Sequence, residues 1–173
     1  MKFYSGFSLQ NEVYLFERYL RKNDYTVVGF SYGAIKALEN VIQTLDKGER
    51  VDTLQLLSPA FFQTKDKKFK RLQLLSYKKN QAEYMQQFLA GCFAPYEAKI
   101  VESRTTTQEE LSELLEYEWC YETLLSLTKR GLKIEVYLGG ADAIIDVAGA
   151  REFFLELATV TYIKNANHFL QLN

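Results

Sequence analysis

The sequence contains few of the residues on which several common classes of protein depend. Its 173 residues include one histidine, two cysteines and two prolines. Two cysteines, Cys92 and Cys120, are too few for a disulfide framework or a cysteine-rich zinc site, and one histidine excludes a histidine-rich metal cluster. Any histidine chemistry must therefore use His168, and we expect no bound metal.

Long apolar runs and an excess of charge of either sign are also missing. The 21 Lys and Arg residues nearly balance the 22 Asp and Glu residues, which leaves a net charge of −1. This balance argues against a protein that coats nucleic acid or an anionic membrane surface. No stretch has the roughly 18 apolar residues of a membrane span, and no signal-like apolar run follows Met1. We expect a soluble cytoplasmic protein that binds neither nucleic acid nor membrane.

The chain has enough apolar residues for one compact core. Hydrophobic residues make up 47% of the sequence and charged residues 25%, a composition that excludes disorder. A length of 173 residues suits a single domain over residues 1–173 and is too short for two ordinary ones.

Short apolar segments alternate with helical ones along the chain. Segments with strand character lie at residues 2–4, 25–28, 51–57, 134–138 and 160–163. Helical periodicity follows at 9–20, 34–45 and 147–157. Alternating strands and helices form right-handed crossovers, so we predict an α/β fold with about five parallel strands in sequential order.

Residues 60–130, between the third and fourth strands, interrupt this alternation. The segment is far longer than a crossover requires, and its periodicity predicts two helices. The first covers about Lys67–Leu89 and is basic; the second begins at a capping box, Thr107–Glu110, and ends at Gly131. Such an insertion suits a lid over the carboxyl edge of the sheet, and extra packing helices suit it equally well.

The motif Gly29-Phe30-Ser31-Tyr32-Gly33 follows the second strand and precedes a helix. This strand–turn–helix setting is that of a nucleophile elbow, in which a tight turn requires glycine on both sides of the serine. The turn would raise Ser31 Oγ above the sheet at a helix N-terminus, where developing negative charge is favoured. An incidental serine in a glycine-bordered turn is the alternative.

A serine nucleophile needs a base and a group that orients the base. His168 follows the last strand, and the loop after the preceding strand contains Asp142 and Asp146. Asp142 lies directly after the strand and is the predicted orienting carboxylate, whereas Asp146 is better placed to cap the next helix. The predicted catalytic residues are therefore Ser31, Asp142 and His168.

Acyl transfer also needs hydrogen-bond donors for the oxyanion. One should be the backbone N–H of Tyr32, the residue after the nucleophile, and the second should come from the loop after the first strand. In that loop, Ser5-Gly6-Phe7, the backbone N–H of Phe7 is the predicted donor.

Taken together, these motifs resemble those of the α/β-hydrolases. Over nearly its whole length the chain resembles, more narrowly, the short BioV-type pimeloyl-acyl-carrier-protein methyl ester esterases of biotin synthesis. The resemblance is carried by Phe3–Phe7, Gly29–Gly33, Phe69–Leu74, Gly139–Asp146 and Asn167–Gln171. It implies a reduced α/β-hydrolase fold with a helical lid, and hydrolysis of the pimeloyl methyl ester to methanol and a free terminal carboxylate without a cofactor. A thioesterase or an esterase for another acyl chain would use the same triad, and an inactive binding module is a further alternative.

The distribution of charge suits an acidic partner such as acyl carrier protein. Residues 65–79 have a net charge of +6, so the rest of the chain sums to −7. On a helix, Lys67, Lys70, Arg71 and Lys78 fall within an arc of roughly 100°. We predict that these four residues dock the carrier protein; a solvated helix face is the alternative.

One face of the predicted sheet should be poorly covered, because sequential right-handed crossovers place every helix on the other face. In the fourth strand, Glu135 and Tyr137 alternate with apolar residues, unlike the solid apolar runs of most parallel strands. We expect this second face to be partly exposed, covered by part of the insertion, or used in a homodimer.

Overall fold

The computed structural model describes residues 1–173 and has a single five-stranded parallel sheet at its centre. The strands are β1 (Lys2–Tyr4), β3 (Thr26–Phe30), β4 (Thr53–Leu57), β6 (Lys133–Gly139) and β7 (Thr159–Ile163). They are arranged in the order β1-β3-β4-β6-β7, and every neighbouring pair is parallel. The α/β fold predicted from the sequence, with five sequential parallel strands, is confirmed.

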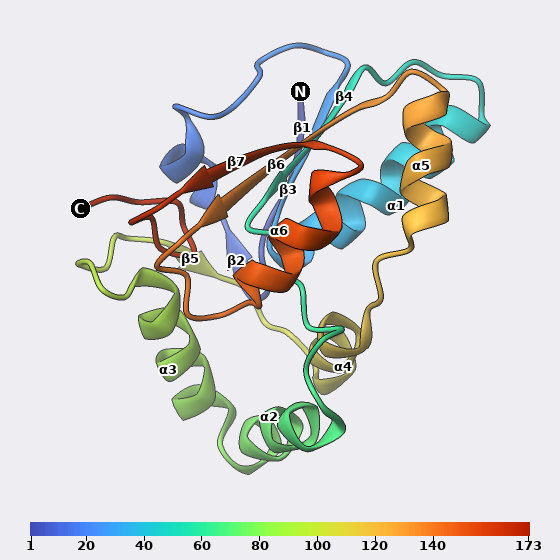
Figure 1. Cartoon of the computed structure of the whole chain (residues 1–173). Helices are drawn as coiled ribbons and strands as arrows, with labels where there is room; N and C mark the ends of the chain where they lie inside the picture. The colour runs from blue at the N-terminus through green and yellow to red at the C-terminus, as the bar shows by residue number, and fades with distance from the viewer.

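Three crossover helices cover one face of this sheet. They are α1 (Tyr32–Asp46), α5 (Tyr121–Lys129) and α6 (Val147–Leu155), and they lie on the same side of the strands in Figure 1. Their apolar residues form the larger core with the strand residues that point toward them, such as Val27, Leu56 and Val136. This arrangement follows from the right-handed connections between successive parallel strands.

The long segment between β4 and β6 contains four helices where the sequence predicts two. They are α2 (Lys67–Lys79), α3 (Gln81–Phe93), α4 (Gln108–Glu116) and the crossover helix α5. Asn80 divides the first predicted helix, because its backbone is extended and its side chain accepts the N–H of Glu83 to begin α3. The predicted capping box at Thr107 and Glu110 is present and begins α4. α2, α3 and α4 lie together at one end of the sheet (Figure 1). We call them the lid helices for this position; that they act as a lid stays a prediction.

The second face of the sheet is covered without a layer of long helices. A smaller core forms there from nine buried residues: Leu9, Phe16, Val28, Phe30, Leu57, Cys92, Phe93, Phe169 and Leu170. Val28, Phe30 and Leu57 belong to β3 and β4, and the other six come from the start of the chain, the end of α3 and the C-terminal segment. Part of the insertion therefore covers this face, which is one of the arrangements expected from the sequence.

Gln55 and Glu135, two polar residues of the second face, are buried and contact each other. The Glu135 carboxylate accepts a hydrogen bond from Gln55 Nε2 at 3.0 Å and pairs with Arg21 at 2.6 Å. Thr159 and Thr161 on the edge strand β7 stay exposed. A homodimer through this face would have to form at these exposed positions, and it stays a prediction.

The helix predicted over residues 9–20 is wrong. This segment forms a two-residue strand, β2 (Leu9–Gln10), and a short 3-10 helix, η1 (Glu12–Phe16). β2 pairs antiparallel with β5 (Glu102–Ser103) of the insertion, and this long-range pairing overrides the local helical periodicity. None of the helices is both long and apolar enough to cross a membrane.

Candidate active site

Ser31 lies in a strained turn between β3 and α1. Its backbone has φ 52° and ψ −116°, a conformation that a non-glycine residue adopts only when its surroundings enforce it. Hydrogen bonds from Ser31 N–H to Leu57 O (2.9 Å) and from Ala60 N–H to Ser31 O (3.1 Å) hold the turn. The local geometry is that of a nucleophile elbow, as the motif predicts.

The two glycines of the motif are required by close backbone contacts. A Cβ atom on Gly29 would collide with the carbonyl oxygen of Gly33, and one on Gly33 would collide with the carbonyl oxygens of Tyr4 and Ser5. The partners in each case are backbone atoms, which cannot move aside without shifting a strand or the helix. The elbow therefore packs directly against the end of β1.

The structure brings the three predicted catalytic side chains into one hydrogen-bonded chain. His168 Nε2 lies 3.0 Å from Ser31 Oγ, and His168 Nδ1 lies 2.6 Å from Asp142 Oδ2. An imidazole protonated at Nδ1 would donate to Asp142 and accept from the Ser31 hydroxyl. The histidine and aspartate side chains are 1% and 0% exposed, so water does not compete for these hydrogen bonds.

Asp142, not Asp146, contacts the histidine. The second oxygen of Asp142, Oδ1, accepts the backbone N–H of Ile144 at 2.7 Å, which fixes the carboxylate in its loop. Asp146 caps α6 through the N–H of Gly149. The hydrogen bond from Thr64, together with that from Gly149, lowers the pKa of Asp146, as expected of a capping carboxylate. Asp142 is therefore the aspartate beside His168, at the place that the sequence predicts for the orienting carboxylate.

The loop that carries His168 is fixed by its neighbours. Asn167 Nδ2 donates to Phe93 O at 2.7 Å, and Asn167 Oδ1 accepts the N–H of Gln171 at 3.0 Å. The His168 ring lies 5.0 Å from the ring of Phe30, centroid to centroid. Because Phe93 ends the lid helix α3, the insertion also supports the position of the histidine.

The two predicted oxyanion donors lie on adjoining segments. The rings of Phe7 and Tyr32 pack edge to face with centroids 6.2 Å apart. Neither the Phe7 N–H nor the Tyr32 N–H has an acceptor among the hydrogen bonds of the loops and helix caps. Both groups therefore remain free to donate to a ligand.

An apolar cavity of about 260 Å³ lies beside the acid loop, under the lid helices. Its wall includes Ala143 and Ile144, the two residues after Asp142. The remaining lining residues come mainly from the insertion: Phe62, Phe69, Gln73, Tyr84, Gln87, Phe88, Leu111, Leu114 and Leu115. Nine of its eleven lining residues are hydrophobic, so the cavity suits an apolar group such as an acyl chain.

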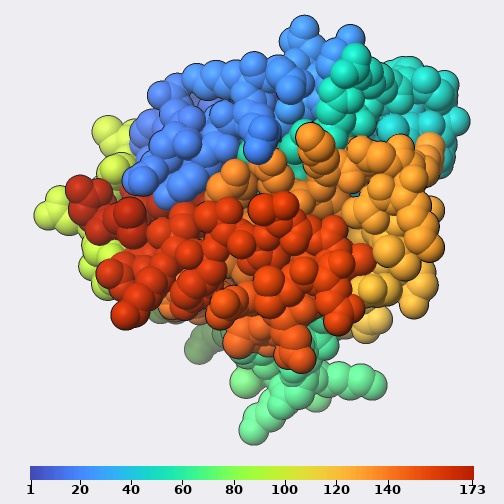
Figure 2. Space-filling model, turned by 45° about the horizontal axis from the view of Figure 1, so that its top comes forward, coloured from blue at the N-terminus to red at the C-terminus, as the bar shows by residue number.

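The four basic residues of the predicted docking face do not share one environment. Lys70 is only 7% exposed, and its Nζ pairs with Glu116 of α4 at 3.1 Å. The charge of Lys70 therefore stabilises the contact between α2 and α4. Its assignment to an exposed docking face is wrong. Lys67, Arg71 and Lys78 are exposed on α2, which projects from the body of the molecule in Figure 2.

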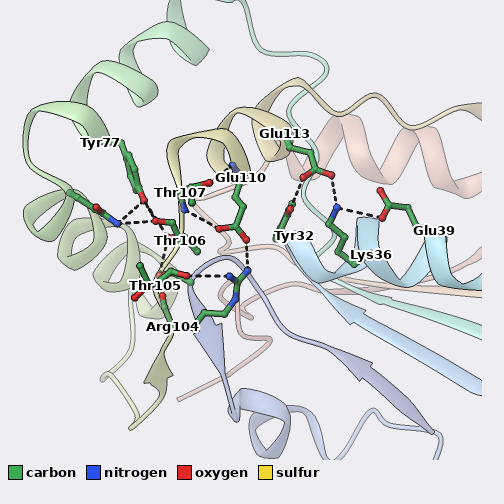
Figure 3. Close-up of polar contacts among 12 residues, drawn as sticks. Tyr32, Lys36, Glu39, Tyr77, Arg104, Thr105, Thr106, Thr107, Glu110 and Glu113 are labelled. Carbon is green, nitrogen blue, oxygen red and sulfur yellow. Dashed lines mark hydrogen bonds and ion pairs between the residues drawn. The ribbon is translucent and has the colours of Figure 1, made fainter.

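Glu113 of α4 links the lid to the elbow helix, a contact that the sequence does not reveal. Its carboxylate accepts hydrogen bonds from Tyr32 Oη at 2.7 Å and from Lys36 Nζ at 2.5 Å (Figure 3). Burial and the hydrogen bond to Glu113 raise the pKa of Tyr32 to about 12. Burial alone would raise the pKa of Glu113, but the hydrogen bonds from Lys36 and Tyr32 outweigh it and lower that pKa.

Replacing Glu113 by glutamine should destabilise the protein modestly at neutral pH. Because the pKa of Glu113 is lowered on folding, its stabilisation is present above its ordinary value of 4.5 and is lost as the pH falls. For this partly exposed pair we expect a loss of about 1 kcal/mol, or about 2–4 °C in Tm, at pH 7. Thermal unfolding at pH 7 and pH 3.5 measures it, with the exposed Glu109→Gln as control; a difference that does not shrink at pH 3.5 contradicts the role.

Solved structures of other proteins share the fold of this chain. The structure superimposes on an esterase from Exiguobacterium antarcticum with a TM-score of 0.62 and 16% identity, over 83% of this chain and 59% of that one. It superimposes on BioG from Haemophilus influenzae with a TM-score of 0.56 and 12% identity, over 97% and 87% of the two chains. The chain has the α/β-hydrolase fold.

Other structures with the α/β-hydrolase fold agree. An enzyme that degrades N-acyl homoserine lactones matches with a TM-score of 0.65 and 13% identity, over 98% of this chain and 86% of that one. The chain spans only 54% of the length of a hydrolase from Bacillus subtilis and 59% of the length of the Exiguobacterium esterase. No protein-family model and no curated protein matches by sequence.

No group of three or more His, Cys, Asp or Glu side chains is placed to hold a metal ion.

Proposed function

We propose that this protein is a serine carboxylesterase that uses Ser31, His168 and Asp142 as its catalytic residues. The observation that carries the proposal is the hydrogen-bonded chain from Asp142 through His168 to Ser31 at a strained elbow. The same three groups in this relation form the acyl-transfer triad on several unrelated folds. The esterases and hydrolases among the structural neighbours support this activity.

In the proposed mechanism, Ser31 Oγ attacks the ester carbonyl carbon while His168 Nε2 takes the hydroxyl proton. Asp142 holds the imidazole in the required tautomer and stabilises its charged form. The N–H groups of Phe7 and Tyr32 donate to the oxyanion. His168 returns the proton to the departing alcohol, which leaves an acyl group on Ser31. Water, deprotonated by His168, then attacks this acyl-enzyme, and His168 returns the proton to Ser31 Oγ as the bond to the acyl group breaks and the carboxylic acid leaves.

The proposed substrate is the methyl ester of pimeloyl-acyl-carrier-protein. The resemblance of the sequence to the biotin-synthesis esterases favours it, and the similarity in fold to BioG over 97% of this chain is compatible with it. The apolar cavity beside the acid loop suits a short acyl chain. A thioesterase or an esterase for another acyl chain is the second candidate, because the triad is common to all of them.

The deciding experiment compares three substrates. Methanol release is measured for the pimeloyl-acyl-carrier-protein methyl ester and for the carrier-free methyl ester, and acid release is measured for the carrier-free pimeloyl thioester. We expect the carrier-bound methyl ester to give the highest kcat/KM. Faster cleavage of the thioester would instead favour the thioesterase. A folded protein that cleaves none of these substrates would contradict both candidates.

Reversing the exposed positive charges of α2 should impair only the carrier-bound reaction. In the variant Lys67→Glu/Arg71→Glu, like charge would repel an acidic carrier protein, so we expect kcat/KM to fall about tenfold or more at low salt. The measurement compares the carrier-bound and carrier-free methyl esters. Lys70 is left unchanged because it holds α2 to α4.

The matched control, Lys47→Glu/Lys129→Glu, changes the charge equally at exposed sites where α1 and α5 end. Both sites lie near the amino ends of the strands, away from the lid. Equal losses for the two double variants, or equal losses on both substrates, would rule out docking on α2.

A further inference from the structure

Glu12 is a buried carboxylate beside the predicted oxyanion loop. It lies at the start of η1 and is 0% exposed. Its Oε1 atom accepts the backbone N–H of Gly6 at 2.7 Å, whereas its Oε2 atom has no hydrogen-bond partner. Burial of such a group is unfavourable unless a specific contact compensates for it. The hydrogen bond to Gly6 is that contact.

Gly6 is held on both sides of its α-carbon. Its N–H donates to Glu12, and its carbonyl oxygen accepts the N–H of Leu9 at 3.2 Å. The Gly6 carbonyl and the Phe7 N–H belong to one planar trans peptide, so they point in opposite directions. Fixing the carbonyl toward Leu9 therefore directs the Phe7 N–H away from Leu9, and that N–H has no acceptor within the protein.

The other sides of the loop around Gly6 are held by apolar packing and by the insertion. A Cβ atom on Gly6 would lie 2.8 Å from the ring of Phe30, so apolar packing fills the space on that side. On the outer side, Ser8 Oγ donates to Arg104 O at 2.8 Å, and Arg104 N–H donates to Ser8 O at 3.0 Å. Arg104 itself pairs with Glu110 at 2.9 Å, as Figure 3 shows. The insertion thus holds the outside of the loop, and Glu12 holds its inside.

We propose that Glu12 is a positioning residue for catalysis: its hydrogen bond to the Gly6 N–H holds the loop so that the Phe7 N–H points at the oxyanion. This inference rests on the proposed serine-esterase function. Glu12 does not touch the substrate, and its acceptor atom rather than its charge is what the loop requires. The conservative variant Glu12→Gln keeps that acceptor, whereas Glu12→Leu has a similar size and removes it.

The test measures kcat and KM for p-nitrophenyl butyrate, together with amide hydrogen exchange of residues 5–9, in wild type and both variants. Loss of one oxyanion donor lowers turnover about 10²–10³-fold. We expect Glu12→Leu to lower kcat by about 10²-fold with KM changed less than about threefold, and to speed exchange at residues 5–9. Glu12→Gln should stay within about fivefold of wild type by kcat and should keep slow exchange.

Three results would overturn the inference. They are a folded Glu12→Leu with the kcat of wild type, a Glu12→Leu with unchanged exchange, and a Glu12→Gln as impaired as Glu12→Leu. If Glu12→Leu does not fold, the variant Glu12→Asp tests the inference instead, because its shorter carboxylate cannot reach Gly6. We expect kcat of Glu12→Asp to fall tenfold or more. A kcat equal to that of wild type would overturn the inference. A wild type that hydrolyses no ester would instead overturn the proposed function, and the catalytic role of Glu12 with it.

Discussion

Replacing Ser31 by alanine is expected to lower ester hydrolysis at least about 10³-fold without unfolding the protein. The Ser31 hydroxyl is the proposed nucleophile, and its hydrogen-bond partner is His168 at 3.0 Å. Removing the nucleophile of a triad removes most of the catalysis, and the oxyanion donors and substrate binding provide what remains. The measurement is kcat for a methyl ester together with labelling by a fluorophosphonate probe, which should modify wild type and leave Ser31→Ala unmodified.

Ser58 provides a matched control for this experiment. It lies at the carboxyl end of the neighbouring strand β4, it is 0% exposed, and its hydroxyl has no hydrogen-bond partner. Like Ser31, it has a positive φ, 41° against 52°. Ser58→Ala should keep both turnover and labelling. Labelling of Ser31→Ala, or failure of folded wild type to label, would contradict a nucleophilic role for Ser31.

Replacing Asp142 by asparagine should be nearly as damaging, with a fall in kcat of about 10³–10⁴-fold. The asparagine side chain would keep the size of the original but present an amide to His168 Nδ1, which favours the tautomer that cannot accept the Ser31 proton. The carboxylate that stabilises the charged imidazole would also be lost. Because Asp142 Oδ1 also accepts the N–H of Ile144, unfolding by heat must be measured alongside kcat to show that the loop is retained.

Asp146→Asn is the control, since the two aspartates share a loop and only Asp142 contacts His168. Asparagine is also a good N-cap, so α6 should begin normally and the loss of stability should be well under about 1 kcal/mol. We expect kcat within about threefold of wild type. Equal losses in the two variants would mean that the carboxylate beside His168 has no special role.

Much of the candidate site could be predicted because it depends on local backbone geometry and chain order. The glycines around Ser31 are required by a turn of five residues. His168 and Asp142 follow from the rule that functional loops lie at the carboxyl ends of parallel strands. The capping box at Thr107 and the cap at Asp146 are signals only a few residues long. In all of these cases the interacting groups are close in sequence, or their order along the sheet is dictated by right-handed crossovers.

The predictions that were wrong concern how segments face one another. Lys70 belongs to the same basic arc of α2 as its exposed neighbours, but the rotation of α2 against α4 buries it beside Glu116. Helical periodicity over residues 9–20 gives way to pairing of β2 with β5, about 90 residues away. The break at Asn80 lies inside a continuous helical pattern, and the cap that it provides becomes evident only when the lid helices are packed.

The parallel sheet, the elbow and the three side chains that meet there follow from the sequence alone, because turn sterics, capping and strand order act over short stretches of chain. The contacts of two carboxylates with segments next to the elbow become evident only in the folded chain. Glu12 reaches Gly6 across a turn that no periodicity predicts, and Glu113 reaches Tyr32 from a helix 81 residues further along the chain. Such contacts depend on how whole segments are placed relative to one another. Burial of the two hydrophobic cores determines this placement, and no local sequence pattern encodes it.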